Sequence, residues 1–133
     1  MNSRQKGARG ERCAAAAWSE VFGGTARRGQ QFSGSPDSPD IVTDFPEIHI
    51  EVKRTERGNP YSWLEQAVTD AGPGQCPLVL HRRNNQEWIV IVRLTDVPRL
   101  AAAVAAKAQA MGGGAVPGAL PGSGVPASGA QDG

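Results

Sequence analysis

Two carboxylates and a lysine stand at a spacing that can do chemistry on a phosphodiester bond. Asp40 precedes the β-prone run 41–43, and Glu51 and Lys53 lie at the end of a second β-prone run that begins at Ile48. Two carboxylates can hold a hard divalent cation, and the lysine adds an ammonium group beside it. This combination suits hydrolysis of a phosphodiester bond, and it favours a nuclease.

The two runs read as a hairpin because the residues between them, 44–47, have the composition of a turn. A loop centred on the middle of this turn places Ile41 opposite Ile50. The same register places Asp40 opposite Glu51.

Side chains alternate along a strand, so Glu51 and Lys53 project from the face that carries Asp40, and the apolar residues at 41, 48, 50 and 52 face the core. Carboxylates that face each other repel, unless a cation or a shared proton lies between them. We therefore predict a Mg²⁺ site here. The alternative is a surface ion pair between Asp40 and Lys53, which would stabilise the fold by only about 0–1 kcal/mol.

A third acid comes from the first helix, which we expect over residues 3–22, with Ser3 as N-cap and Gly23-Gly24 as its end. Glu11 extends the apolar stripe of this helix by one turn, so we expect it on the inward face. A buried carboxylate is costly unless it is paired or binds metal. The alternative is a half-exposed glutamate paired with a neighbouring arginine.

Two glycines in this helix, Gly7 and Gly10, each weaken it by roughly 1 kcal/mol relative to alanine. We expect them where the backbone must closely approach a phosphate or the sheet.

Composition divides the 133-residue chain into two parts. Residues 112–133 consist largely of Gly, Pro, Ala and Ser, which cannot bury enough apolar surface to fold, so we expect a disordered tail. Residues 1–111 are then a single nuclease domain with one core. Two isolated cysteines, with no visible signal peptide or membrane span, favour a reduced cytoplasmic setting in a bacterial, archaeal or phage-infected cell.

The net charge of +1 says little about partners, but the bases are almost all arginines, whose forked donors match phosphate oxygens. The predicted order is helix, three strands, helix, two strands, helix, which is an α/β fold with a mixed five-stranded sheet flanked by helices. Beyond the first helix and the hairpin, the expected elements are a strand over 25–32, a helix over 60–71 capped by Asn59, strands over 77–81 and 88–93 that are buried on both faces, and a helix over 95–111 capped by Thr95.

The ordered motifs resemble the PD-(D/E)xK nuclease superfamily, most of all its archaeal-type Holliday junction resolvases and their phage relatives. The matching elements are Lys6-Gly7-x-x-Gly10-Glu11-Arg12, Ser33-Gly34, Pro39-Asp40, Glu51-Val52-Lys53 and a helix that carries Gln66.

The resemblance implies a restriction-endonuclease-like core, Mg²⁺ or Mn²⁺ as cofactor, and a homodimer that acts on branched DNA. It implies a catalytic set of Glu11, Asp40, Glu51 and Lys53, in which the three acids and the Val52 carbonyl hold the metal. The residues expected to contact DNA are Lys6, Arg9, Arg12, Arg28, Ser33, Arg54 and Gln66. His49 falls on the acid face, either as a catalytic assistant or as a passive neighbour.

These motifs leave three functions open. The first is a junction-resolving endonuclease, and the second is another nuclease of the superfamily that nicks, repairs or restricts DNA. The third is a non-catalytic DNA-binding protein of the same fold, which the apposed acids disfavour because a pure binder has no need of them.

Overall fold

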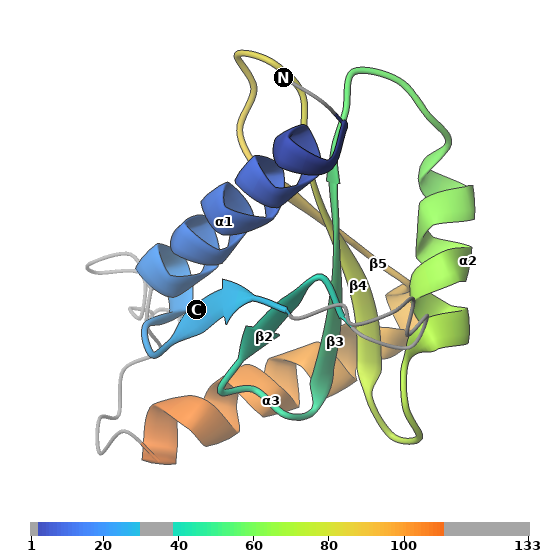
Figure 1. Ribbon diagram of the computed structural model, residues 1–133. Coiled ribbons are helices and arrows are strands. Elements are labelled where there is room, and N and C mark those ends of the chain that lie inside the picture. Colours follow the sequence, from blue (N-terminus) through green and yellow to red (C-terminus); the bar gives the residue numbers. More distant parts are fainter. Residues whose placement is uncertain (1–2, 30–38, 111–133) are drawn as a thin grey trace, which may run out of the picture.

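The computed structural model describes residues 3–29 and 39–110, with side chains from residue 7 onward. Ser33, the side chain of Lys6 and the segment 112–133 therefore lie outside the described part of the chain. Its elements are α1 (Ser3–Phe22), β1 (Ala26–Arg28), β2 (Ile41–Thr43), β3 (Ile48–Arg54), α2 (Pro60–Asp70), β4 (Cys76–Arg82), β5 (Ile89–Val92), a 3₁₀ turn (Leu94–Asp96) and α3 (Val97–Ala110) (Figure 1).

The five strands form one mixed sheet in the order β1-β2-β3-β4-β5. All neighbours are antiparallel except β3 and β4, which run parallel. A parallel pair needs a crossover connection, and α2 supplies it. The predicted element order and the mixed five-stranded sheet are confirmed.

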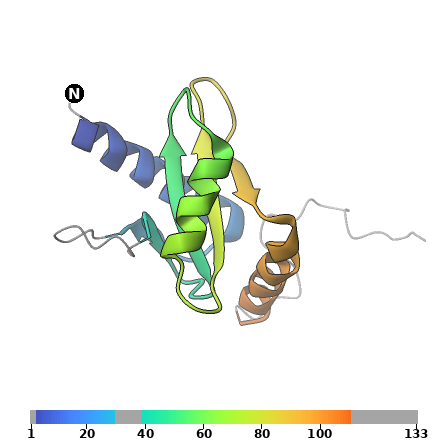
Figure 2. The same cartoon turned by 90° about the vertical axis from the view of Figure 1, so that its right-hand side faces the viewer.

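Helices cover both faces of this sheet. α2 lies over one face, and α1 passes behind the other (Figures 1 and 2). The core on the α1 side combines Trp18 with β-strand residues such as Ile50 and Leu78, and Ala103 of α3 belongs to the same cluster. Within the described residues, no helix is long and apolar enough to cross a membrane.

Local signals fixed the first two helices. α1 spans the predicted residues, and it ends where Gly23 and Gly24 adopt positive φ angles of 75° and 74°. α2 begins as predicted, because the Asn59 side chain accepts a hydrogen bond from the Tyr61 backbone N–H at 2.9 Å and Pro60 fills the first turn.

The prediction for β5 was wrong in its burial. Ile89 and Val90 are 51% and 43% exposed, because β5 is the edge strand of the sheet and is not covered on both faces. β4, its neighbour, is buried from Cys76 to Leu80 as expected. A continuous apolar run does not distinguish a central strand from an edge strand.

The prediction for the start of the last helix was also wrong. Thr95 lies inside the 3₁₀ turn and does not cap α3, which begins at Val97. The turn is closed by a hydrogen bond from the Asp96 N–H to the Arg93 carbonyl at 2.9 Å, and by an ion pair between the same two side chains at 2.7 Å. The first strand is shorter than expected, Ala26–Arg28, and residues 30–32 lie outside the described part of the chain.

The turn between β2 and β3 is tied to both ends of the domain. Lys107 of α3 donates to Asp44 at 2.7 Å, and the Thr25 N–H before β1 donates to the other carboxylate oxygen at 3.3 Å. This ion pair lowers the pKa of Asp44, chiefly through the hydrogen bond from Lys107. The turn that sets the hairpin register is therefore held from two sides.

The two glycines of α1 should respond oppositely to alanine. A Cβ on Gly10 would lie 2.9 Å from the Arg54 Cβ, whereas one on Gly7 would meet nothing within 4 Å. Gly10→Ala should destabilise the fold by roughly 1 kcal/mol or more through this overlap. Gly7→Ala, the matched control, should stabilise it by up to about 1 kcal/mol through helix propensity.

Urea unfolding at unchanged slope measures both effects. Equal stability changes in the two variants would show that α1 does not approach β3 as closely as described.

Candidate active site

The hairpin register brings Asp40 and Glu51 together. Ile41 pairs with Ile50 as predicted, so Asp40 faces Glu51 one residue further along. The Asp40 N–H donates to the Ile50 carbonyl at 3.0 Å, and the Asp40 carboxylate accepts a hydrogen bond from the Val52 N–H at 2.8 Å. The Asp40 carboxylate is thus held against the backbone of β3 at Val52, the residue between Glu51 and Lys53.

Asp40 also contacts the acid from α1. Burial raises the pKa of Glu11, and both the charge of Asp40 and a hydrogen-bond contact with it raise that pKa further. Burial is likewise the main cause of the raised pKa of Glu51, to which Asp40 contributes by the same two effects. Asp40 therefore stands between Glu11 and Glu51, and the three predicted acids form one cluster.

Each glutamate in this cluster has a second partner that opposes the shift. Arg28 donates from Nε to a carboxylate oxygen of Glu11 at 2.6 Å, and the Glu11 side chain is 15% exposed. His49 donates from Nε2 to Glu51 at 2.7 Å, and these two side chains are 2% and 6% exposed. A buried carboxylate needs such a partner, because an unpaired charge out of water is costly.

The donor set fits a hard divalent cation in its chemistry, since all three acids offer carboxylate oxygens. Within residues 3–29 and 39–110, however, no group of three or more His, Cys, Asp or Glu side chains is arranged so that it could hold a metal ion. Arg28 and His49 each contact one carboxylate oxygen of a glutamate in the cluster. The raised pKa values of both glutamates mean that the cluster favours added positive charge, as protons or as a cation.

Lys53 projects from the sheet face that carries Glu51, because the two residues are separated by one on the same strand. Its side chain is partly exposed, and it makes no hydrogen bond or ion pair within the described residues. The ammonium group therefore has no partner in the part of the chain that the structure describes. The predicted role of the Val52 carbonyl stays a prediction, whereas the Val52 N–H has a structural task in holding Asp40.

The predicted DNA-contacting residues fall into three groups. Arg9 and Arg12 are exposed on α1. Arg28 and Arg54 are engaged within the protein, the first with Glu11 and the second with Glu56, Asn84 and the Arg82 carbonyl. Arg54 also lies on the opposite sheet face from Lys53, one position along β3.

The Gln66 side chain is exposed on α2 and makes no hydrogen bond with another described residue. It lines a shallow concavity of about 520 Å³ with Ser62, Glu65, Thr69 and Asp70. Its predicted role as an accessory residue stays a prediction. The side chain of Lys6 and the whole of Ser33 lie outside the described residues, so their expected contacts with DNA stay predictions.

Two contacts of the cluster went beyond the sequence prediction. Alternation along the strand had placed His49 on the acid face, and the structure makes it the buried partner of Glu51. Arg28 pairs with Glu11 in the structure, and its expected contact with DNA stays a prediction. No local pattern signals an ion pair between residues 17 positions apart on different elements.

An α/β core with an acid pair and a lysine on adjacent strands defines a class of protein, the restriction-endonuclease-like PD-(D/E)xK nucleases. The model of a family described as "Phage putative PDDEXK endonuclease" matches residues 2–112. The chain belongs to this family and to the PD-(D/E)xK superfamily, which supports nuclease activity. No curated protein and no solved structure matches the chain. The family description names no DNA substrate, so the four-way junction expected from the sequence stays a prediction.

The acid cluster should make stability depend on pH in a defined direction. Because the pKa values of Glu11 and Glu51 are raised above the ordinary value of 4.5, the folded chain keeps these protons to higher pH than the unfolded chain. Their contribution is complete below that value and is lost as pH rises through the raised pKa values. In EDTA, the melting temperature should therefore fall over this window.

Glu51→Gln should flatten the fall, and Glu20→Gln, an exposed acid on α1, should leave it unchanged. A wild-type melting temperature that rises steadily across the same window in EDTA would contradict the cluster as described.

Proposed function

We propose that this protein is a metal-dependent, structure-selective endodeoxyribonuclease. The observation that carries the proposal is the contact of Asp40 with the half-buried Glu11 and the buried Glu51, on the sheet face from which Lys53 projects without a partner among the described residues. A chain that only binds DNA gains nothing from an aspartate that repels two neighbouring glutamates. Membership in an endonuclease family supports the same conclusion.

Mg²⁺ or Mn²⁺ is the cofactor that we propose, held by Asp40 and Glu51, with the Val52 carbonyl and Glu11 completing the shell. The ion would polarise a phosphate oxygen and make a bound water easier to deprotonate. Each glutamate has a second carboxylate oxygen that its contact with Arg28 or His49 does not use, and an ion bound there would weaken the attraction between Glu11 and Arg28. Arg28 is then available to a phosphate oxygen, which is the DNA contact expected from the sequence.

Lys53 serves in this proposal to orient the attacking water or to stabilise charge that develops on the phosphate. His49, buried against Glu51, acts as a positioning residue that fixes the orientation of the carboxylate.

We propose branched DNA as the substrate class, with the four-way junction as its leading member, on the strength of the sequence motifs. A two-fold homodimer would present two equal sites to the two equivalent strands of such a junction. Recognition would then use backbone shape more than base edges. The other candidate is cutting of linear duplex, which a family described only as endonucleases also allows.

Asp40→Asn should abolish cleavage and leave DNA binding intact. The asparagine oxygen can still accept the hydrogen bond from the Val52 N–H, so the hairpin is kept while the charge is lost. The assay compares a labelled four-way junction, linear duplex and single strand, each with Mg²⁺ and with EDTA, and Glu20→Gln serves as the control acid.

Cleavage of the junction by wild type and Glu20→Gln in Mg²⁺ alone is the expected result. Undiminished cutting by Asp40→Asn would falsify the catalytic assignment. Equal cutting of linear duplex would keep the nuclease and remove the junction preference.

Metal binding can be measured without catalysis. A cation that binds the folded chain stabilises it by about 2.7 kcal/mol when its concentration is a hundred times its Kd. Mg²⁺ or Mn²⁺ should therefore raise the melting temperature of wild type at neutral pH, and should raise that of Asp40→Asn far less. Equal shifts in both proteins would place the ion elsewhere.

A further inference from the structure

A hollow of about 510 Å³ lies at the carboxyl ends of β3 and β4, and its lining includes neither Lys53 nor any of the three acids. His81 of β4 and Ile89 of β5 form its floor, and they pair with each other in the sheet. On its other side, His81 pairs with Lys53 of β3. Paired residues project from the same sheet face, so this row begins at the candidate catalytic lysine. Trp63 of α2, the helix that covers this face in Figure 2, forms the wall. We call this hollow the Trp63 pocket.

The aromatic lining of the Trp63 pocket is held in place by specific contacts. The rings of Trp63 and His81 lie with centroids 4.7 Å apart at an angle of 49°. His81 donates from Nδ1 to the Lys53 carbonyl at 2.8 Å, which fixes its ring and ties the pocket to the catalytic strand. Gly58 has a φ of 138°, and a Cβ at this position would collide with the Trp63 ring.

The rim of the pocket carries arginines that are available for a ligand. Arg57 and Arg83 are exposed, and their guanidinium groups have no hydrogen bond or ion pair within the described residues. Two acids also line the hollow. Glu56 is engaged by the Asn84 N–H at 2.8 Å and by Arg54 at 3.4 Å, while Glu87 is exposed. The exposed rim therefore carries Arg57 and Arg83 against Glu56 and Glu87, and Glu56 is already paired with Arg54.

We propose that the Trp63 pocket binds one unpaired nucleotide of the DNA strand that is cut, next to the scissile phosphate. The base would lie against Trp63 and His81, and a phosphate would contact Arg57 or Arg83. The volume falls within the range of roughly 300–1,000 Å³ that small-molecule sites occupy. This inference rests on the proposed function and narrows its substrate to DNA with an unstacked base beside the cut.

The sheet geometry places the pocket residue His81 next to the candidate catalytic residue Lys53. Adjacent strands lie roughly 4.8 Å apart, so the His81 position is one strand away from Lys53. A base that is paired and stacked inside a duplex cannot present its face to an aromatic ring, whereas an unpaired base can, and such stacking tolerates any base. Branch points and gaps supply bases of this kind.

Binding in EDTA tests the proposal without cleavage. The probes are a fluorescein-labelled duplex with a short single-stranded gap and the same duplex without the gap, each titrated with the full chain. Trp63→Leu should weaken binding to the gapped DNA by roughly tenfold, the effect of losing one stacked base, and should leave binding to continuous duplex unchanged.

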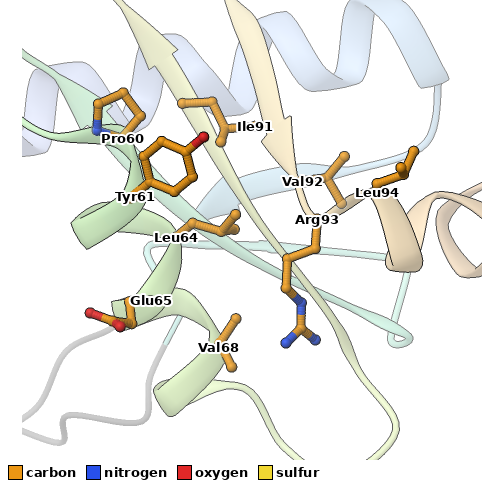
Figure 3. Close-up of a pocket in the computed structure, with 9 residues that line it drawn as sticks. All are labelled: Pro60, Tyr61, Leu64, Glu65, Val68, Ile91, Val92, Arg93 and Leu94. Carbon is orange, nitrogen blue, oxygen red and sulfur yellow. The ribbon is translucent and has the colours of Figure 1, made fainter.

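The matched control is Tyr61→Leu. Tyr61 lies two residues away on the same helix and is 85% exposed, but it lines a separate apolar groove between α2 and β5 (Figure 3). This variant should bind both DNAs like wild type. A double variant, Arg57→Gln with Arg83→Gln, alters only exposed side chains, so it carries the test if Trp63→Leu fails to fold. It should weaken binding to gapped DNA more than binding to continuous duplex.

An abasic nucleotide in the gap provides a second check. It should weaken binding to wild type and have no further effect on Trp63→Leu. Equal losses on gapped and continuous DNA, or no loss on either, would overturn the proposal. Because these titrations contain no metal, a chain that binds gapped DNA through Trp63 but never cuts would retain the pocket and refute the nuclease. Mg²⁺-dependent cutting by wild type, together with unchanged binding of gapped DNA by the variants, would support the nuclease and refute the Trp63 pocket as a nucleotide site.

Discussion

The arrangement of the site depends on one contact, the carboxylate of Asp40 held against the backbone of β3. Its hydrogen bond from the Val52 N–H fixes an acid at the point where two further carboxylates converge. Burial and the charge of Asp40 both disfavour the charged forms of Glu11 and Glu51, so this convergence costs free energy. The raised pKa values of the two glutamates reflect this cost. Arg28 and His49 offset part of the cost in the absence of a cation. The fold therefore holds Asp40 close to two glutamates although the negative charges repel.

The two faces of the sheet divide the work. The face under α1 and α3 is apolar, and it gives the domain its core. The face under α2 carries the polar row of β3, in which His49 and Glu51 are buried and Lys53 is not. Because β3 and β4 run parallel, their carboxyl ends open at the same edge of the sheet. Polar groups from both strands can meet there without interrupting the core.

The sequence predicted the parts of this protein that local rules determine. The turn at residues 44–47 predicted the Ile41–Ile50 register, and the Asn59-Pro60 pair predicted the start of α2. The inward stripe of α1 placed Glu11 among the acids. Errors arose where long-range packing decides: β5 proved to be an edge strand, and Thr95 was absorbed into a 3₁₀ turn. The partners of Glu11 and the meeting of Trp63 with His81 depend on how elements dock, which no spacing along the chain encodes.

The clamp on the β2–β3 turn has a consequence for how the site is assembled during synthesis. Every candidate catalytic residue has left the ribosome's active centre once residue 53 is made, yet the lysine that grips Asp44 is residue 107. About half of the nascent domain must be added before the turn is fastened from the α3 side. The first half of the domain thus contains all of the candidate acids, and α3, which is made last, supplies the Lys107 contact that stabilises their hairpin.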